Sequence, residues 1–407
     1  MANREMKYSG VEWIGEIPKG WKVTKLRNCL RTPITDGPHE TPRYVDEGIP
    51  FISVNAINGD GTINRQVANR ISESDARIYN NKTNLEVGDI LFTKAATIGK
   101  IAIVDVVDFM IWSPIAVIKS NKRMYNHFLK YVFMCNGFLS HVSNLGTKNT
   151  QINVGMRAME QSKVPVLSLS EQQKIAAFLD EKTSHIDNII ENTKKSIENL
   201  KAYKQSLITE TITKGLDPNV EMKNSGIQWI GEIPKHWRVT KVKNFVQIKN
   251  GKDNKVKDGE IPVYGSGGVF GKTDQIMYEK ASVLLGRKGT IDSPKYIEKP
   301  FWAVDTTFYT IAKPNVALKF FYYLMKSIDY KKYTYGSAIP SMSQSILNEI
   351  KLPYTNLDEQ KQIAIFLDDK TSHVDSLIKQ KEQLVAELES YKKSLIYEYV
   401  TGKKEVK

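Results

Sequence analysis

The chain contains the same two sequence motifs twice, in the same order. Residues 7–28 read KYSGVEWIGEIPKGWKVTKLRN and residues 223–244 read KNSGIQWIGEIPKHWRVTKVKN, with 15 of 22 positions identical at an offset of 216. A second motif reads EQQKIAAFLDEKTSHID at 171–187 and EQKQIAIFLDDKTSHVD at 359–375, at an offset of 188. A repeat of this kind predicts two related structural units in one fold.

The segments between the motifs, 29–163 and 245–351, show no visible alignment, and the two offsets differ by 28 residues. A chain that keeps two scaffolds alike while varying two inserts is expected to use the inserts for recognition. The alternative is a duplication whose inserts drifted without purpose, but such drift would have eroded the scaffold as well.

The second motif begins a long helix in each copy. Neither 171–213 nor 359–400 contains proline or glycine, so each predicts one helix of about 60 Å at about 1.5 Å per residue. Ser170 and Asp358 are the expected N-caps, and Gln173 completes a capping box in the first copy.

Both helices show heptad spacing, which predicts that they pair as an antiparallel coiled coil with a pseudo-twofold axis. The predicted seam runs through Ile186, Ile189, Thr193, Ser196, Leu200, Tyr203 and Leu207 in the first helix, and through Val374, Leu377, Lys381, Leu384, Leu388, Tyr391 and Leu395 in the second. Thr193 and Lys381 either set the register or are tolerated polar positions.

The variable segments read as mixed α/β, with strands expected at 48–54, 88–93 and 100–107 in the first and at 260–265, 281–286 and 301–312 in the second. The sequence therefore predicts an α+β fold of two mixed α/β domains and two long helices. The expected boundaries are 1–163 for the N-terminal domain, 164–216 for the central helix, 217–351 for the C-terminal domain and 352–407 for the distal helix.

The net charge of +13 is concentrated outside the helices. Residues 171–216 carry no net charge and 358–407 carry −1, whereas 29–163 carry +3 and 245–351 carry +6. A basic protein favours an anionic partner, with nucleic acid ahead of a membrane surface, although a generally basic protein without such a partner stays an alternative. The distribution suits two domains that touch phosphates and a helical rod that does not.

Loops of both variable segments carry residue types suited to DNA. Arg and Lys suit guanine edges, Asn and Gln suit adenine, and Ser and Thr suit phosphates. The candidates in the first segment are Thr35, Asp36, His39, Thr41, Arg43, Lys94, Thr97, Lys100, Lys148, Asn149 and Gln151. Those in the second are Tyr264, Ser266, Arg287, Lys288, Thr306, Thr307, Tyr335, Ser341 and Gln344. Ordinary turns share this composition.

Motifs for catalysis or metal binding do not emerge. Gly271-Lys272-Thr273 lacks the earlier glycine of a phosphate-binding loop, and the nuclease-like 217–223 (DPNVEMK) lies between a helix and a repeat. His185 and His373 stand two residues from an Asp, a spacing that does not share a helix face. Cys29 and Cys135 are expected as buried hydrophobes in a reducing compartment.

The composition excludes other classes. With 41% apolar and 25% charged residues the chain is neither disordered nor collagen-like. Its length suggests about two or three domains. No window approaches the roughly 18 apolar residues of a membrane helix, and the N-terminus lacks the apolar region of a secretory signal. A cytoplasmic location is expected.

Taken together, the chain resembles the specificity (S) subunit of type I restriction–modification systems. The resemblance covers nearly the whole length and rests on SGVEWIGEIPKGW at 9–21, SGIQWIGEIPKHW at 225–237 and the two helical motifs. The loops TDGPHETP, GDILFTKAATIGK, IPVYGSGG, GRKGTI and DTTFY are similar to those of the family as well.

The resemblance implies two target recognition domains that each read one half of a split, asymmetric DNA site, and a coiled coil that sets the spacing. It implies double-stranded DNA, two modification (M) methyltransferase subunits and two restriction (R) translocase and nuclease subunits as partners. S-adenosylmethionine, ATP and Mg would be used by those partners, and this chain would be non-catalytic. The competing hypotheses are a nuclease or nucleotide-dependent enzyme and a scaffold that binds only protein.

Overall fold

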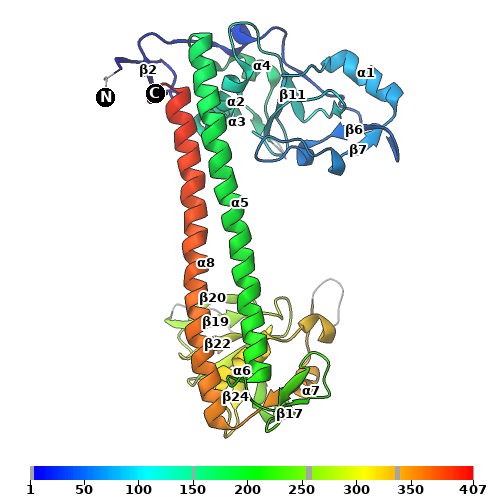
Figure 1. The fold of residues 1–407 in the computed structure, drawn as a ribbon, viewed down its shortest axis with the longest axis vertical. Coiled ribbons are helices and arrows are strands. Elements are labelled where there is room, and N and C mark those ends of the chain that lie inside the picture. The colour runs from blue at the N-terminus through cyan, green and yellow to red at the C-terminus, as the bar shows by residue number, and fades with distance from the viewer. Residues whose placement is uncertain (1–3, 149–151, 254–258, 335–339, 407) are drawn as a thin grey trace. The chain divides into compact units, whose positions relative to one another are not determined.

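The computed structural model describes residues 4–148, 152–253, 259–334 and 340–406 (Figure 1). The chain divides into two compact units, here called unit 1 (Met1–Thr193 with Gln383–Lys407) and unit 2 (Lys194–Glu382). Each unit therefore contains one variable segment and one half of each long helix. Among the described residues, no helix combines the length and the apolar character that crossing a membrane requires.

The two long helices are α5 (Leu169–Lys214) and α8 (Leu357–Val400). They begin two residues before the predicted starts, so the predicted caps Ser170 and Asp358 are wrong and lie inside the first turn. The caps are instead Ser168, whose hydroxyl accepts from Glu171 N (3.3 Å), and Asn356, whose Oδ1 accepts from Glu359 N (3.0 Å).

A local side-chain hydrogen bond accompanies the earlier start of each helix. The side-chain amide of Gln172 donates to Leu167 O (2.9 Å), and that of Gln360 donates to Thr355 O (2.7 Å). Each bond ties the first helical turn to the chain before it, and sequence alone did not reveal this contact.

Within each unit, half of α5 packs antiparallel against half of α8, but the buried seam differs from the predicted one. The buried and half-buried positions along the seam are Ile186, Ile190, Thr193, Ile197, Leu200, Lys204 and Leu207 in α5, and Val374, Ile378, Lys381, Val385, Leu388, Lys392 and Leu395 in α8. Ile186, Leu200, Leu207, Val374, Leu388 and Leu395 were placed correctly.

Every second predicted seam position is displaced by one residue in both helices. Ile189 and Leu377 are half-buried beside the seam, while Tyr203, Leu384 and Tyr391 are 55%, 42% and 53% exposed. At half of these points the physical reason is that two apolar residues stand side by side, as in Leu384-Val385, so heptads starting on either residue fit the sequence equally well.

Two lysines occupy the seam where the sequence suggested tyrosines. In unit 2, Lys204 Nζ of α5 lies 2.5 Å from Asp375 of α8, and in unit 1, Lys392 Nζ of α8 lies 2.6 Å from Asp187 of α5. The two ion pairs are copies of each other under the repeat. Each lysine buries its aliphatic stem along the seam while its ammonium reaches a carboxylate on the facing helix.

Each unit contains two main sheets, both four-stranded in unit 1 and one four-stranded and one three-stranded in unit 2. In unit 1 the orders are β4-β11-β8-β9 and β10-β6-β7-β5. The strands are β4 (Thr35–Asp36), β5 (Tyr44–Val45), β6 (Ile49–Ile52), β7 (Asn69–Ile71), β8 (Ile90–Thr93), β9 (Ile101–Ile103), β10 (Met110–Ile111) and β11 (Ile115–Ile118). The helices of this segment are α1 (Glu73–Thr83), α2 (Asn126–Met134), α3 (Asn136–Asn144) and α4 (Met156–Gln161).

In unit 2 the orders are β18-β24-β21-β22 and β20-β19-β23. The strands are β18 (Val246–Asn250), β19 (Ile261–Gly265), β20 (Gly268–Thr273), β21 (Ser282–Gly286), β22 (Lys295–Ile297), β23 (Trp302–Ala303) and β24 (Thr307–Ala312), and the helices are α6 (Leu318–Lys326) and α7 (Gln344–Glu349). The strand predicted over 301–312 is two strands, because the chain leaves one sheet after β23 and enters the other at β24.

The two variable segments share one topology even though their sequences do not align. Strands β4, β8, β9 and β11 of unit 1 correspond to β18, β21, β22 and β24 of unit 2, and the parallel pair β10-β6 corresponds to β23-β19. The predicted α+β organisation with an internal repeat is confirmed, and the repeat extends into the inserts.

The first motif forms an equivalent frame in both units. It contributes the hairpins β1 (Met6–Tyr8)–β2 (Glu16–Pro18) and β15 (Met222–Asn224)–β16 (Glu232–Pro234). It then pairs β3 (Lys22–Lys25) with β14 (Lys163–Val166), and β17 (Arg238–Lys241) with β25 (Lys351–Tyr354). Since β14 and β25 lead directly into α5 and α8, the first motif is joined to the second in each unit. In unit 1 the remaining short pair is β12 (Thr147–Lys148) with β13 (Ile152–Asn153).

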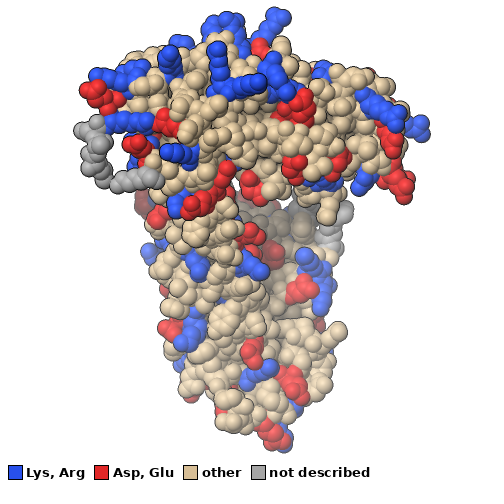
Figure 2. Space-filling model, turned by 45° about the horizontal axis from the view of Figure 1, so that its top comes forward, with Lys and Arg blue, Asp and Glu red and all other residues tan. Residues whose placement is uncertain are grey.

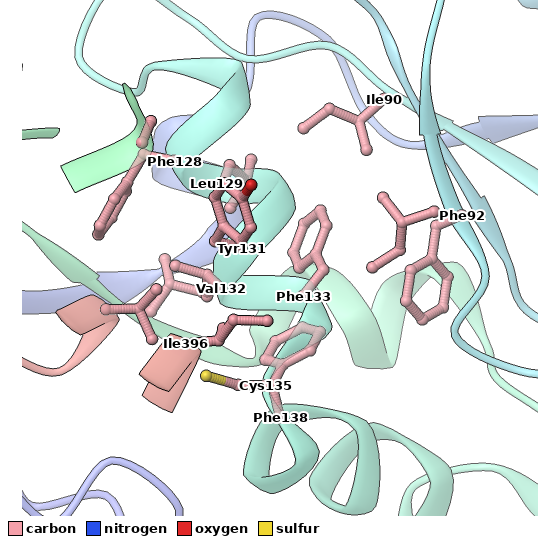
Figure 3. Packing of buried hydrophobic residues seen from close by; sticks show 14 of the residues in the cluster. Ile90, Phe92, Phe128, Leu129, Tyr131, Val132, Phe133, Cys135, Phe138 and Ile396 are labelled. Atoms are coloured by element: carbon pink, nitrogen blue, oxygen red, sulfur yellow. The ribbon is translucent and has the colours of Figure 1, made fainter. Parts of the chain in front are cut away.

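One helix of each variable segment forms the centre of the core. In unit 1, Phe128, Leu129, Val132 and Phe133 of α2 are fully buried between Phe92 of β8 and Ile396 of α8 (Figure 3). The helix α6 of unit 2 buries Phe320, Phe321 and Leu324 in the equivalent way. Cys29 and Cys135 are buried as predicted, and burial raises the pKa of both thiols.

The second motif clamps this central helix to the long helix by hydrogen bonds. Gln172 accepts from Tyr125 N (2.7 Å) at the start of α2, and Asp180 accepts from Lys130 Nζ and Tyr131 Oη (both 2.7 Å). Thr183 completes the contact 3.0 Å from Tyr131 Oη.

The clamp is repeated in unit 2 at the offset of the motif. Gln360 accepts from Ala317 N (2.9 Å), Asp368 accepts from Lys319 Nζ (2.6 Å) and Tyr323 Oη (2.8 Å), and Thr371 lies 3.1 Å from Tyr323 Oη. The repeated Gln, Asp and Thr of the second motif are therefore explained by a structural contact.

Replacing Asp180 by alanine is expected to lower the free energy of unfolding by about 1–2 kcal/mol at pH 7, because Lys130 and Tyr131 lose a charged acceptor. Burial by itself would raise the pKa of Asp180, but hydrogen bonds from His127, Lys130 and Tyr131 outweigh it and hold that pKa well below its usual range. The stabilisation is therefore complete above the unfolded pKa of about 4 and is lost as the pH falls below it.

Urea unfolding of both proteins from pH 7 down to pH 2 measures this difference. Glu181→Ala is the matched control, since the Glu181 side chain is 71% exposed, and it should change the free energy of unfolding by less than about 0.5 kcal/mol. A difference between wild type and Asp180→Ala that persists undiminished at pH 2 contradicts the assignment.

Equivalent glycines stand where the two sheets of each unit meet. A Cβ at Gly37 would lie 2.1 Å from Ile111 O, and one at Gly251 would lie 2.0 Å from Val304 O.

We expect Gly251→Ala to destabilise the protein by about 3 kcal/mol, because backbone atoms must move apart. Gly267→Ala, where a Cβ meets open space, should leave the melting temperature nearly unchanged in thermal unfolding. Equal melting temperatures of the two variants would refute the expectation.

Candidate nucleic-acid interface

Four segments of unit 2 that are distant in sequence meet at one edge of its four-stranded sheet. Arg287 N, after β21, donates to Thr306 O (2.8 Å), before β24, and Met342 N donates to Arg287 O (2.9 Å). Lys288 and Ser341 form an isolated β-bridge, and Ser266 N donates to Thr306 Oγ1 (3.4 Å). The structure thus brings together Ser266, Arg287, Lys288, Thr306 and Ser341, as candidates from separate loops.

The remaining described candidates of unit 2 have contacts within the fold. Tyr264 packs edge-on against Phe301, with ring centroids 6.1 Å apart, and burial raises its pKa. Thr307 is buried, and Gln344 Nε2 donates to Ile248 O (3.0 Å). These three side chains support the edge of the sheet rather than project from it.

A surface hollow of about 290 Å³ opens beside this cluster. It is lined by Asn250, Arg287, Lys288, Phe308, Ser341, Met342, Ser343 and Gln344. Its walls carry amide, hydroxyl and cationic groups over an aromatic floor, which is the set of side chains that can contact both base edges and phosphates.

Unit 1 holds its charged candidates differently. Asp36 of β4 is 1% exposed and Lys94, after β8, is 6% exposed. Asp36 Oδ2 lies 3.2 Å from Lys94 Nζ and from His39 Nε2, and Asp36 Oδ1 accepts from Lys82 Nζ (2.8 Å). Neither contact of Oδ2 has good hydrogen-bond geometry. Lys94 is thus buried against Asp36, a carboxylate that it shares with Lys82.

The other candidates of unit 1 lie mostly at the surface. His39, Thr41, Arg43 and Thr97 are exposed and Thr35 is half-buried. Lys100 donates from Nζ to Val54 O (3.0 Å), so its ammonium is held by the fold.

Three candidates, Asn149, Gln151 and Tyr335, lie outside the described residues. The backbone of Lys148 lies in β12, which pairs with β13.

Sequence reasoning missed three residues of these sites. Lys82 reaches Asp36 from α1, Asn250 ends β18 beside the hollow, and Lys295 donates to Ser266 O (3.0 Å) with a pKa that burial lowers. No local pattern marks them, because each acts through a partner that only the fold brings near.

The motifs set aside in the sequence have ordinary structural places. Gly271, Lys272 and Thr273 lie in strand β20, and the 217–223 segment is a turn that leads into β15. His185 and His373 are exposed on the long helices. Among the described residues, no group of three or more His, Cys, Asp or Glu side chains could hold a metal ion.

The positive charge of the variable segments is visible on the surface. Figure 2 shows Lys and Arg side chains spread over the upper face of unit 1, with most of the acidic side chains toward its edges. Together with the net charge of +6 in 245–351, this gives both units the electrostatic character of proteins that bind polyanions.

Comparison with known proteins identifies relatives over most of the chain. Over 294 residues the chain is 30% identical to the type I restriction enzyme MjaVIII specificity subunit of Methanocaldococcus jannaschii, covering 64% of this chain and 67% of the relative. Over 437 aligned positions it is 26% identical to the putative type I restriction enzyme MjaX specificity subunit of the same organism, covering 97% and 96%.

Solved structures share the fold at low sequence identity. One chain, from work on complex assembly and conformational transition of the type I R-M system, has a TM-score of 0.71 at 15% identity and covers 95% of this chain and 99% of its own. The HsdS subunit from Thermoanaerobacter tengcongensis has a TM-score of 0.50 at 14% identity and covers 95% and 98%.

The family model matches both copies of the repeat. It describes the type I restriction modification DNA specificity domain and matches residues 18–201 and 234–387, each of which takes in a first-motif strand, a variable segment and most of a long helix. The chain belongs to the family of type I restriction–modification DNA specificity proteins.

Proposed function

We propose that this chain is the subunit that selects the DNA site of a type I restriction–modification complex, and that it carries out no chemistry itself. Unit 1 reads one half of a bipartite, asymmetric site in double-stranded DNA and unit 2 reads the other. The observation that carries the proposal is the pair of variable segments with one topology and unlike loops, each clamped to the same helical scaffold.

Reading of DNA is supported by the loop cluster of unit 2. Five candidates from four loops converge beside an open hollow, and the segment that contains them carries the largest excess of positive charge. In unit 1 the surface candidates are His39, Thr41, Arg43 and Thr97, while Asp36, Lys94 and Lys100 hold the loops that present them. Lys148, Asn149, Gln151 and Tyr335 stay candidates by residue type.

The helices set the distance between the two half-sites. Both α5 and α8 are continuous through residues of both units. A helix rises about 1.5 Å per residue and changes length only by unfolding, so a helical pair is suited to hold a fixed spacer.

The same helices dock two modification subunits. Ile189, Tyr203, Leu377, Leu384 and Tyr391 follow heptad spacing beside the seam, and three of them are strongly exposed. Exposed apolar residues at helical spacing favour packing of further helices, and the stripe occurs on both copies of the repeat, which suits two copies of one partner.

The chemistry belongs to the partners in this proposal. The modification subunits use S-adenosylmethionine to methylate adenine, and two restriction subunits use ATP and Mg for translocation and cleavage. The complex acts in the cytoplasm, where it meets incoming DNA.

Exchanging residues 29–163 for the corresponding segment of another family member is expected to change one half of the methylated site and leave the other half and the spacer unchanged. Exchange of 245–351 is the matched experiment and should change the other half. Methylation sequencing of DNA from cells carrying each complex gives the outcome. If one exchange changes both halves of the site, or neither half, the assignment of one half-site to each unit is excluded.

Lengthening both helices by one heptad, after Thr193 and after Glu382, is expected to add about 3 base pairs to the spacer, since seven residues add about 10.5 Å and each base pair spans about 3.4 Å. A heptad keeps the seam in phase. Lengthening α5 alone breaks the pairing and should lower the melting temperature instead. If a well-folded double insertion methylates a site whose spacer is unchanged, the helices do not set the distance between the half-sites.

A further inference from the structure

Backbone hydrogen bonds place Lys94 of unit 1 and Arg287 of unit 2 at the same point of the shared topology. Lys94 N donates to Pro114 O and Arg287 N to Thr306 O, both at 2.8 Å. The carbonyl oxygen of Lys94 accepts from Val154 N, and that of Arg287 accepts from Met342 N, both at 2.9 Å. The matched bonds define an equivalence that sequence comparison of the two segments does not give.

Strand register makes Asp36 and Asn250 equivalent as well. Asp36 pairs with Ala116, which pairs with the residue two before Lys94. Asn250 pairs with Phe308, which pairs with the residue two before Arg287. Each is followed by one of the two equivalent glycines. The same site therefore holds a carboxylate in unit 1 and a neutral amide in unit 2.

The neighbouring cation, a lysine in unit 1 and an arginine in unit 2, differs in its surroundings as well. In unit 1, the ammonium of Lys94 is buried 3.2 Å from the carboxylate of Asp36. In unit 2, no carboxylate of the described residues forms an ion pair with Arg287. Its Nη1 donates to Asp305 O (3.3 Å) and the guanidinium lies 6.0 Å from the ring of Phe308.

Among the described residues, Asp305 O is the acceptor that the guanidinium of Arg287 reaches, and this half-buried cation lies at the wall of an open hollow. A guanidinium has five N–H donors in a fixed fork, so the donors that the described residues do not engage can bind a ligand that supplies acceptors. The fork matches the O6 and N7 acceptors of guanine in the major groove, and it matches phosphate oxygens as well.

The position of Arg287 favours the base edge over the phosphate. Arg287 is recessed among Asn250, Ser341 and Gln344, whereas its neighbour Lys288 is exposed. A flexible exposed ammonium suits the backbone, and a recessed fork held over an aromatic ring suits a planar acceptor pair.

We propose that Arg287 reads a guanine in the half-site bound by unit 2, and that Lys94 makes no such contact at the equivalent point of unit 1 because it is buried against Asp36. This rests on the proposed function. It makes the half-site of unit 2 contain a G·C pair whose identity depends on one side chain.

The test compares Arg287→Met and Arg287→Lys with the wild-type full chain in its complex with the modification subunits, by methylation sequencing. Arg287→Met should lower the preference for guanine at one position of the unit 2 half-site by about ten- to a hundredfold, the range of one bidentate pair. Arg287→Lys keeps the positive charge but loses the guanidinium fork, so it should lower the preference for guanine at the same position by a smaller factor. This variant still tests the proposal if Arg287→Met fails to fold.

Lys288→Ala is the matched comparison. It should weaken DNA binding evenly across sequences and reduce the slope of log affinity against log salt by about one, with no change in base preference. The inference is overturned if Arg287→Met and Arg287→Lys weaken all sites evenly, as a phosphate contact would, if they change nothing, if they change the half-site of unit 1, or if the wild-type half-site of unit 2 contains no G·C pair. Failure of the proposed function would appear separately, as an exchange of 245–351 that alters no half-site.

Discussion

The structure depends on the clamp between each long helix and the central helix of its recognition segment. In unit 1 the clamp joins Gln172, Asp180 and Thr183 of α5 to the start and the Tyr131 face of α2, and unit 2 repeats it with Gln360, Asp368 and Thr371. A charged acceptor that receives several hydrogen bonds in a partly buried place is costly to replace by other chemistry. The clamp therefore accounts for the repeat of the second motif better than helix formation does, since many sequences form helices.

With the clamp constant, the sheets attached to it can vary. The central helices α2 and α6 bury aromatic faces against both the long helix and a four-stranded sheet, so any segment that supplies such a face and the same strand order fits the scaffold. A few points are restricted, such as Gly37 and Gly251 directly after β4 and β18, where backbone atoms leave no space for a side chain. Apart from such points, the loops at the sheet edge are the part that differs between the units.

The pair of long helices shows which features a sequence pattern can predict and which it cannot. The extent of α5 and α8 and their antiparallel pairing followed from the absence of Pro and Gly and from the heptads, yet the seam was misread at every second position. Leu384 and Val385 are both apolar, and a one-dimensional pattern cannot say which of two neighbours faces the partner. At Lys204 and Lys392 the choice depends on Asp375 and Asp187 across the interface, and a search for apolar residues overlooks such a pair.

By itself the sequence determined the duplication, the two long helices, the location of the positive charge and the family, because repeats, helix breakers and charge are properties of the linear chain. Only the tertiary structure decided that the two variable segments share a topology, that Ser168 and Asn356 cap the long helices, and that Lys94 and Arg287 are equivalent. Whether a lysine or arginine is free to meet DNA depends on what lies within a few ångströms of its charge. For Lys94 that neighbour is Asp36, which is remote in sequence and is brought near by strand pairing alone.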